Sequence, residues 1–395
     1  MMIWRFQIGW GFALWLAAIA SGEAADPIPI GEINPWTGLL AAQGTAVHQG
    51  ITVAVDEVNA RGGIRGRPIQ LLSRDDEGKP ERAIASAEEL IARHQVLALV
   101  GGYVDSLVGP IGEVAERGRV PYVATASLDE RLTQRGARYF FRVSSLESYV
   151  RVTTGIVREV FQAKNVAILY SSTPGASQLA RRQREILERA GIKVSVFESF
   201  SPGLSDFTPF LARVRDQGAE VILSDTFFSD HLVLVRQMAQ YGFHVHAFLG
   251  AFGMEFPQVM TELGAASEGL YGTTSWQPGV NLGRHEGASR AFIEAFQKRF
   301  GQPPVPLTMH GYAAARALLS AMEAVVAHGA PLTREAVREA LSQVDVDTPM
   351  GRIKFDAKGN PLYYDRVVIQ IQGGRHVVVY PPERARAPAR YPASR

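Results

Sequence analysis

Near the start of the chain the spacing of apolar residues changes twice. A short apolar run at 28–33 predicts a strand, and the Pro- and Gly-containing segment 34–38 ends it. Between 47 and 58 the apolar residues recur every three or four positions, which is typical of a helix with one buried face. The glycines at 62–63 end this helix, because glycine adopts left-handed dihedrals without a Cβ clash. Since a second apolar run follows at 69–72, the sequence predicts a strand–helix–strand unit here.

The same alternation continues through the middle of the chain. Short apolar runs predict strands at 96–100, 120–124, 166–170, 194–197, 221–224 and 246–249. Amphipathic patterns predict helices at 106–117, 177–190, 208–217 and 230–241, and further helices at 285–300, 309–328 and 333–342. The segment 351–380 has the composition and glycine turns of a β-hairpin. Short strands that alternate with helices predict an α/β protein with parallel sheets covered on both faces.

Length and composition narrow the class of protein. A chain of 395 residues is expected to form about two domains. Hydrophobic residues make up 46% and charged residues 20%, which fits a soluble globular protein. The net charge of +2 and the lack of a basic helix interleaved with aromatic residues argue against nucleic-acid binding. The Pro-, Ala- and Arg-rich segment 381–395 is expected to be a disordered tail.

The N-terminus indicates export. Arg5 precedes an apolar stretch at 8–20, and small residues at 21–25 offer a cleavage site, so 1–25 is expected to be a secretory signal peptide. The alternative, a membrane anchor, is disfavoured because the stretch is shorter than the ~20 residues that a spanning helix needs. The sequence has no cysteine, which excludes disulfides, thiol catalysis and a lipid-modified cysteine. We therefore expect a protein that is free in the periplasm.

Catalytic and cofactor signatures are absent from the sequence. It contains no G-x-G-x-x-G after the first strand, no P-loop, no H-E-x-x-H and no G-x-S-x-G. His244 and His246 share one face of a strand, but no further ligands of a metal site stand near them. The sequence therefore predicts no enzyme activity, no cofactor and no bound metal.

Three motifs in order resemble those of a known family. The loop 31–38 reads G-x-x-x-P-x-T-G, the helix end 59–66 reads N-A-x-G-G-I-x-G, and 75–80 reads D-D-x-x-x-P. Together they resemble the solute-binding proteins of the leucine/isoleucine/valine type, and the resemblance extends to about residue 359.

The resemblance implies the type I periplasmic-binding fold, in which two doubly wound parallel-sheet lobes are joined by three hinge crossovers. The crossovers would lie at 142–145, 273–276 and 349–352. The first lobe would then comprise 26–143 and 276–350, and the second lobe 144–275 and 351–380. The ligand would lie between the lobes, at the carboxyl ends of the strands, where open α/β sheets present a crevice.

The resemblance also implies ligand-binding residues on the first lobe. In amino-acid-binding relatives a hydroxyl at the position of Asp105 holds the ligand carboxylate. An ionised Asp105 in the cleft would repel that carboxylate, or else Asp105 caps the following helix and points away. Ser106 could supply the hydroxyl in its place. The loop after the next strand, with Thr125, Ala126 and Ser127, matches a loop that offers hydroxyl and backbone groups to the ligand.

The second lobe departs from the family pattern. The relatives clamp the ligand ammonium with a carboxylate at the position of Phe252, and a phenyl ring compensates the desolvation of an ammonium less well. Phe227 matches a tyrosine, and Gly175 matches another tyrosine and opens space. With Trp36, Tyr103 and Tyr149 added, these positions predict an aromatic-lined pocket, although some of the rings could instead pack in the core.

These observations lead to a functional expectation. The protein is expected to be a non-catalytic, monomeric receptor that captures a small molecule and delivers it to the membrane permease subunits of an ABC importer. The ligand is expected to be an apolar or aromatic compound, such as an aromatic acid, rather than a plain amino acid. If Asp105 faces the cleft, the polar end of the ligand should instead be a hydroxyl, amide or amine donor. The alternatives are a true branched-chain amino-acid binder, and a ligand sensor or enzyme on the same bilobal fold.

Overall fold

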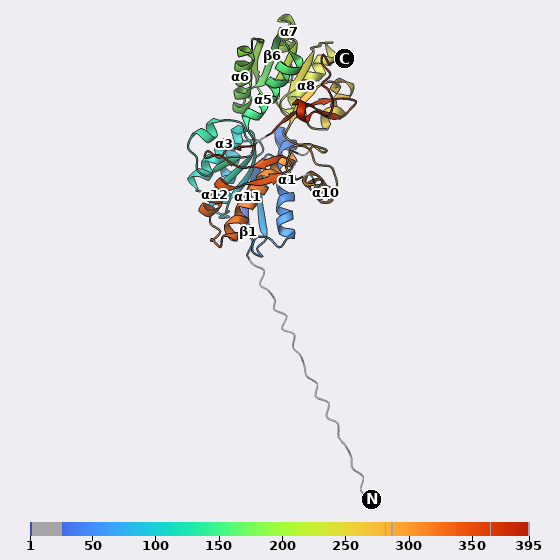
Figure 1. Cartoon of the computed structure of the whole chain (residues 1–395). Helices are drawn as coiled ribbons and strands as arrows, with labels where there is room; N and C mark the ends of the chain where they lie inside the picture. The colour runs from blue at the N-terminus through green and yellow to red at the C-terminus, as the bar shows by residue number, and fades with distance from the viewer. Residues whose placement is uncertain (2–25, 281, 286, 364, 394–395) are drawn as a thin grey trace.

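The computed structural model describes residue 1 and residues 26–280, 282–285, 287–363 and 365–393. The expected signal peptide, 1–25, lies almost wholly outside the described residues. The chain forms two lobes, one above the other in Figure 1, each built on one sheet with helices on both faces. The predicted fold class, two α/β lobes with doubly wound sheets, is confirmed. No helix in the described part of the chain is long and apolar enough to cross a membrane.

The lower lobe in Figure 1 contains a parallel sheet of order β2-β1-β3-β4-β5. Its strands are β1 (Ile28–Asn34), β2 (Ile69–Asp75), β3 (Leu99–Tyr103), β4 (Tyr122–Ala126) and β5 (Phe140–Arg142). Its helices are α1 (Ala41–Ala60), α2 (Pro80–Ala92), α3 (Asp105–Arg117), α4 (Arg131–Gln134), α10 (Ala288–Phe300), α11 (Thr308–Ala327) and α12 (Arg334–Gln343). Apolar residues of α1 and α11 pack in one core cluster, and those of α2 and α3 pack in another.

Two glycines let α1 and α11 approach each other closely. A Cβ at Gly50 would lie 1.8 Å from the carbonyl oxygen of Thr308, and a Cβ at Gly311 would lie 2.1 Å from that of Val47. Only glycine tolerates such an approach of one backbone to another. The two glycines therefore fix where the first turn of α11 lies beside the sheet.

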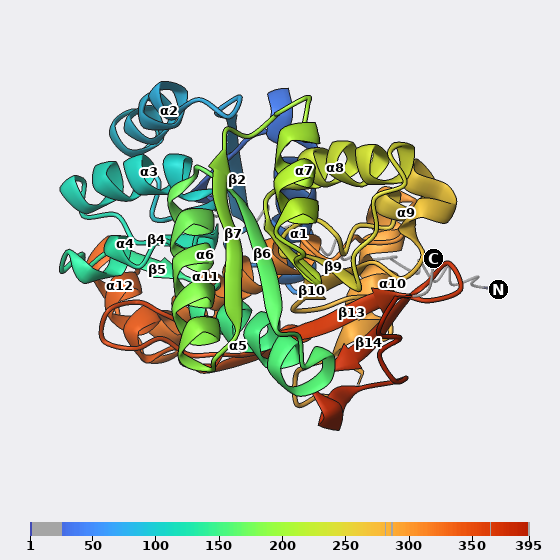
Figure 2. The same cartoon turned by 90° about the horizontal axis from the view of Figure 1, so that it is seen from above.

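The upper lobe contains a mixed sheet of order β14-β13-β10-β9-β8-β6-β7. Its strands are β6 (Asn165–Ser171), β7 (Lys193–Phe200), β8 (Val221–Asp225), β9 (Ala247–Gly250), β10 (Tyr271–Thr274), β13 (Val367–Ile371) and β14 (His376–Tyr380). Its helices are α5 (Leu146–Ile156), continued by a π-helical turn (Val157–Phe161), and α6 (Pro174–Arg189), α7 (Thr208–Asp216), α8 (Phe228–Gln240) and α9 (Gln258–Leu263). Strand β13 is antiparallel to β10 and to β14, so the hairpin at the end of the chain widens an otherwise parallel sheet (Figure 2).

Three connections join the lobes, and the third lies later than we expected. The first leads from β5 to α5, and the second follows β10. Strands β11 (Val346–Thr348) and β12 (Gly351–Ile353) form a separate hairpin. The residues after it stay on the lower lobe, where the ring of Phe355 packs 5.2 Å from that of Phe141 and the amide of Arg142 donates to the carbonyl of Gly359. The chain therefore crosses after residue 361, because this apolar contact holds 351–361 against the lower sheet.

The expectation of a disordered tail is wrong for residues 381–393. The ring of Tyr391 stacks on Phe161 with centroids 4.6 Å apart, and the amide of Ala393 donates to the carbonyl of His246. The backbone of Arg390 bonds to the side chain of Gln370 through both its N–H and its carbonyl. Composition predicted disorder because the segment lacks an apolar pattern of its own. The segment is ordered because side chains of the upper lobe form hydrogen bonds with its backbone.

We predict that Tyr391→Ala lowers the free energy of unfolding by roughly 1–3 kcal/mol, because it removes a stacked ring and exposes Phe161. Tyr391→Phe keeps the ring and should leave the stability close to that of the wild type. Urea unfolding of the three proteins, followed by circular dichroism, measures the difference. Equal midpoints for the wild type and Tyr391→Ala would mean that the tail does not pack on the upper lobe in solution.

Candidate ligand-binding site

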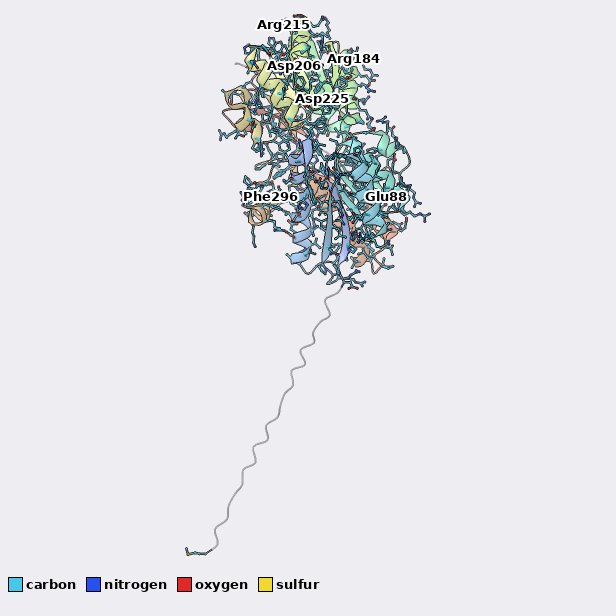
Figure 3. The ribbon with its side chains drawn as sticks, turned by 180° about the vertical axis from the view of Figure 1, so that it is seen from behind. Glu88, Arg184, Asp206, Arg215, Asp225 and Phe296 are labelled. Carbon is cyan, nitrogen blue, oxygen red and sulfur yellow. The ribbon has the colours of Figure 1, made fainter. Side chains whose placement is uncertain are left out.

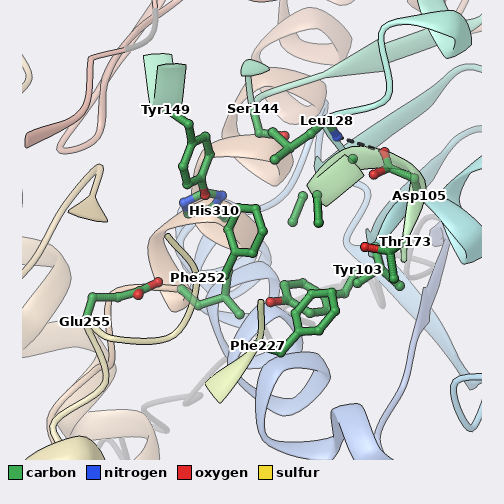
Figure 4. Close-up of a pocket in the computed structure, with 15 residues that line it drawn as sticks. Tyr103, Asp105, Leu128, Ser144, Tyr149, Thr173, Phe227, Phe252, Glu255 and His310 are labelled. Carbon is green, nitrogen blue, oxygen red and sulfur yellow. Dashed lines mark hydrogen bonds between the residues drawn. The ribbon is translucent and has the colours of Figure 1, made fainter. Parts of the chain in front are cut away.

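A cavity of about 50 Å³ lies between the lobes at the carboxyl ends of the strands. Seven of the residues expected at the site line it: Tyr103, Asp105, Ala126, Tyr149, Gly175, Phe227 and Phe252. Figure 4 shows the larger side chains converging on the cavity from both lobes. This volume is far below the ~300–1,000 Å³ of known small-molecule sites, so a ligand can enter only if the lobes part or side chains move.

The turn from β3 into α3 positions Asp105. Gly101 and Gly102 have φ of +117° and +87°, and the amide of Gly102 donates to the side chain of Asn34. Val104 follows with φ +64°, which is rare for a β-branched residue. Such a conformation persists only where its surroundings enforce it, and it occurs preferentially at functional sites. The strained turn places Asp105 at the first position of α3, facing the cleft.

Asp105 neither caps its helix nor stands free in the cleft. Its Oδ1 accepts a hydrogen bond from the amide of Leu128 at 2.8 Å (Figure 4). It also accepts one from the amide of Asp129 at 2.8 Å and one from the hydroxyl of Ser127 at 2.9 Å. Burial raises the pKa of Asp105, although these hydrogen bonds favour the ionised form. The carboxylate thus fastens the loop after β4 to the start of α3.

The second oxygen of Asp105 faces the upper lobe. A Cβ at Gly175, at the start of α6, would lie only 2.2 Å from Asp105 Oδ2. Close by, Gln178 accepts a hydrogen bond from the amide of Glu130 at 3.0 Å and donates one to Asp129 at 2.5 Å. The lobes therefore touch across the cleft, and Gly175 gives the aspartate the space that a side chain would fill.

Four residues expected at the site do not line the cavity. Trp36 packs against His48, with ring centroids 5.0 Å apart, and its backbone amide donates to Asp75 at 2.8 Å. Ser106 is exposed on α3. The hydroxyl of Thr125 is buried and donates to the carbonyl of Gly102. That of Ser127 is used by Asp105. The hydroxyls expected to hold a ligand's polar end are therefore already bonded within the protein.

The aromatic residues form a continuous row along the cavity. The ring centroids of Tyr103 and Phe227 are 6.3 Å apart, those of Phe227 and Phe252 are 5.9 Å apart and nearly parallel, and those of Phe252 and Tyr149 are 5.2 Å apart. The guanidinium of Arg366 covers the Tyr149 ring at 3.5 Å. Tyr103 comes from the lower lobe and the other rings from the upper lobe. The row therefore spans the cleft.

Sequence reasoning missed two ionisable residues that line the cavity, Glu255 and His310. Burial raises the pKa of Glu255 to about 7, and its Oε2 has no hydrogen-bond partner among the described residues. Glu255 stands three positions after Phe252 in the loop after β9. Since Phe252 was identified by its match to a family position, a search of the following residues of this loop for a carboxylate could have found Glu255. His310 comes from α11, far along the chain, and no local pattern marks it.

His310 is uncharged at neutral pH. Burial lowers its pKa to about 3. Its Nδ1 lies 3.3 Å from the carbonyl of Thr125, which can only accept, so we assign the proton to Nδ1. Nε2 then accepts from the hydroxyl of Ser275 at 2.9 Å. His310 thus contributes an uncharged side chain to the wall of the cavity.

A third carboxyl group, Asp225, is buried at the end of β8, two residues before Phe227 (Figure 3). Its Oδ1 accepts a hydrogen bond from Gln183 at 3.2 Å, and its Oδ2 has no partner among the described residues. Burial raises the pKa of Asp225 to about 8. In the part of the chain that the structure describes, no group of three or more acidic or histidine side chains could hold a metal ion.

Comparison with known proteins places this architecture in a family. Residues 27–375 match the family model described as periplasmic binding protein. The chain is 27% identical to Leu/Ile/Val-binding protein homolog 7 of Brucella abortus over 96% of this chain and 98% of that protein. The chain belongs to the periplasmic binding protein family, as the sequence motifs predicted.

Solved structures of similar fold hold different ligands. The branched-chain amino acid transporter substrate-binding protein LivJ from Streptococcus pneumoniae, in complex with isoleucine, superposes with a TM-score of 0.80 at 22% identity, covering 90% of this chain and 100% of that one. A solute-binding protein of an ABC transporter from R. palustris, in complex with benzoate, superposes with a TM-score of 0.78 at 17% identity, covering 89% and 95%. At these identities the likeness shows the fold alone.

We predict that Gly175→Ala keeps the lobes apart, because the added methyl group would collide with Asp105 Oδ2. Small-angle scattering should show a larger radius of gyration than for the wild type. Gly287→Ala is a matched control, since its Cβ would meet nothing within 4 Å. Combining Gly175→Ala with Asp105→Ala should recover part of the compaction. Scattering identical to that of the wild type would contradict the contact.

We also predict that Asp225 makes stability fall as pH rises. The folded-state pKa of about 8 lies above the ordinary 3.8, so between these values the folded protein keeps a proton that the unfolded chain releases. Each pH unit in this window lowers the unfolding free energy by at most about 1.4 kcal/mol. The Asp225→Asn side chain does not titrate, so the unfolding free energy of this variant should rise relative to that of the wild type between pH 4 and pH 8. Parallel stability curves from urea unfolding would refute this.

Proposed function

We propose that this protein is the extracytoplasmic receptor of an ABC importer and captures a small molecule with a flat apolar or aromatic body between its lobes. The observation that carries the proposal is the row of four rings along a cavity where the lobes touch. Rings in offset or edge contact contribute roughly 0.5–1.5 kcal/mol each beyond the burial of their area. The function is binding and delivery without chemical change, and the partners are the permease subunits in the membrane.

Two further observations support a receptor. The family is that of periplasmic binding proteins, and the relative and the solved structures described above carry names of binding proteins. The expected signal peptide agrees with a place outside the cytoplasmic membrane.

Closure of two lobes around a ligand is the motion that such a fold permits, because the ligand gains contacts with both lobes. We propose that the protein acts as a monomer.

A plain branched-chain amino acid is the second candidate. Glu255 favours it, because this residue brings a carboxylate to the loop that carries Phe252, where the relatives hold the ligand ammonium. Asp105 opposes it, because an α-carboxylate on the lower lobe would lie beside a buried carboxylate whose repulsion water does not screen. We therefore favour a ligand without an α-amino-acid group.

Calorimetry with leucine and with a panel of substituted toluenes tests the proposal. We expect a ring compound to bind and leucine to bind weakly or not at all. Phe227→Ala and Phe252→Ala should each weaken binding of the ring compound by several-fold to about tenfold. Phe210→Ala, which removes a ring on the outer helix α7, is the control and should change nothing. Tight leucine binding that neither cavity variant affects would contradict the proposal.

A further inference from the structure

Two carboxylates lie on opposite sides of the cavity. Figure 4 shows Asp105 on one side and Glu255 on the other, with Phe252, Phe227 and Tyr103 between them. Asp105 is only 9% exposed, and its Oδ2 is directed at the cavity wall around Gly175. Glu255 Oε2 is buried and has no hydrogen-bond partner among the described residues. Each side therefore offers a ligand an acceptor oxygen.

The donors of the loop after β4 that could hold a ligand carboxylate are occupied. The amides of Leu128 and Asp129 and the hydroxyl of Ser127 all donate to Asp105 Oδ1. The Asp105 carboxylate thus occupies the place where an anionic ligand group would gather these bonds. A ligand carboxylate here would find few donors and a like charge at close range. The aromatic-acid expectation is disfavoured for this reason.

The cations that act on these carboxylates lie behind the cavity wall. Arg142, which donates to the carbonyl of Asp129 at 3.0 Å, interacts electrostatically with Asp105, and Arg366, over the Tyr149 ring, interacts with Glu255. Among the described residues that line the cavity itself there is no lysine or arginine, and His310 is neutral. A cationic group of a ligand can therefore contact the carboxylate oxygens from the cavity side, where no guanidinium lies.

The rings between the carboxylates suit the same ligand. Tyrosine and phenylalanine faces carry negative partial charge and attract cations within about 6 Å, the more so where water is excluded. Tyr103, Phe227 and Phe252 are all at least nine-tenths buried. They can contact an ammonium group with their faces and an apolar body with their whole area.

On the basis of the proposed receptor function, we propose that the cavity binds an organic cation that spans it. A protonated amine or amidine lies against Asp105 Oδ2, an apolar or aromatic body lies along the Tyr103–Phe227–Phe252 row, and a second hydrogen-bond-donating group reaches Glu255. The ligand class is an amine or diamine with a compact apolar core. Asp105 and Glu255 select its charge, and the rings select its body.

A series of probes of equal shape tests the charge. Calorimetry at pH 8 compares 4-methylbenzylamine, 4-methylbenzyl alcohol and 4-methylbenzoate on the wild-type protein. The amine should bind at least about tenfold more tightly than the alcohol, because a hydrogen bond between charged groups is stronger than one to a neutral group. The benzoate should bind most weakly. Benzoate binding equal to or tighter than amine binding would overturn the inference.

Isosteric variants test the two carboxylates. Asp105→Asn should weaken binding of the amine by at least about tenfold and leave that of the alcohol within about twofold. 1,4-Bis(aminomethyl)benzene should bind more tightly than 4-methylbenzylamine, and Glu255→Gln should abolish that difference. Glu113→Gln, which changes an exposed carboxylate on the same helix as Asp105, is the control. Amine binding unchanged in Asp105→Asn, or an undiminished diamine preference in Glu255→Gln, would refute the assigned role.

The two proposals fail in different ways. If the alcohol or the benzoate binds and the amine does not, the cation inference is wrong and the ring-lined receptor stands. If no ring compound binds in any charge state, the receptor proposal fails with it. Should Asp105→Asn not fold, as judged by circular dichroism, the probe series on the wild type still decides between a cationic and an anionic ligand.

Discussion

The site depends on one buried carboxylate, that of Asp105, which is withdrawn from water between the two lobes. One of its oxygens gathers three hydrogen-bond donors from 127–129 and so joins the loop after β4 to the turn before α3. The other oxygen faces Gly175 across the cleft. A buried charge is stable only when its hydrogen-bonding capacity is used. Asp105 thus connects the loop 127–129, the turn at Val104 and the space left beside Gly175 on α6.

The remaining wall of the cavity is built from elements that lie far apart in the sequence. The close crossing of α1 and α11 at Gly50 and Gly311 brings the first turn of α11, and with it His310, to the lower side of the cavity. The loops after β8 and β9 supply Phe227, Phe252 and Glu255 from the upper side. Because these loops follow adjacent strands, their side chains form one row of rings with a carboxylate at its end.

Fold and ligand are separate questions in this architecture. Structures of the same fold hold isoleucine in one case and benzoate in another. The backbone provides the cleft and its closure, while the charge and shape of the lining decide what is held. In this protein the lining combines the carboxyl groups of Asp105 and Glu255 with a row of rings. This lining, more than the overall likeness, bears on the ligand.

The sequence by itself determined the fold class, because the alternation of short apolar runs and amphipathic helices allows few architectures other than layered α/β lobes. The resemblance to the solute-binding family indicated Gly175, Phe227 and Phe252 as site residues, and these residues, with Tyr103, line the cavity. Only the tertiary structure decided the rest. The hydroxyls of Thr125 and Ser127 bond within the protein because the carbonyl of Gly102 on β3 and the carboxylate of Asp105 on α3 lie beside them. The sequence does not show that these acceptors are close. The order of the tail and the place of His310 depend on segments more than a hundred residues away in the chain. Such contacts leave no local pattern, because burial and hydrogen bonding between distant segments are properties of the folded arrangement alone.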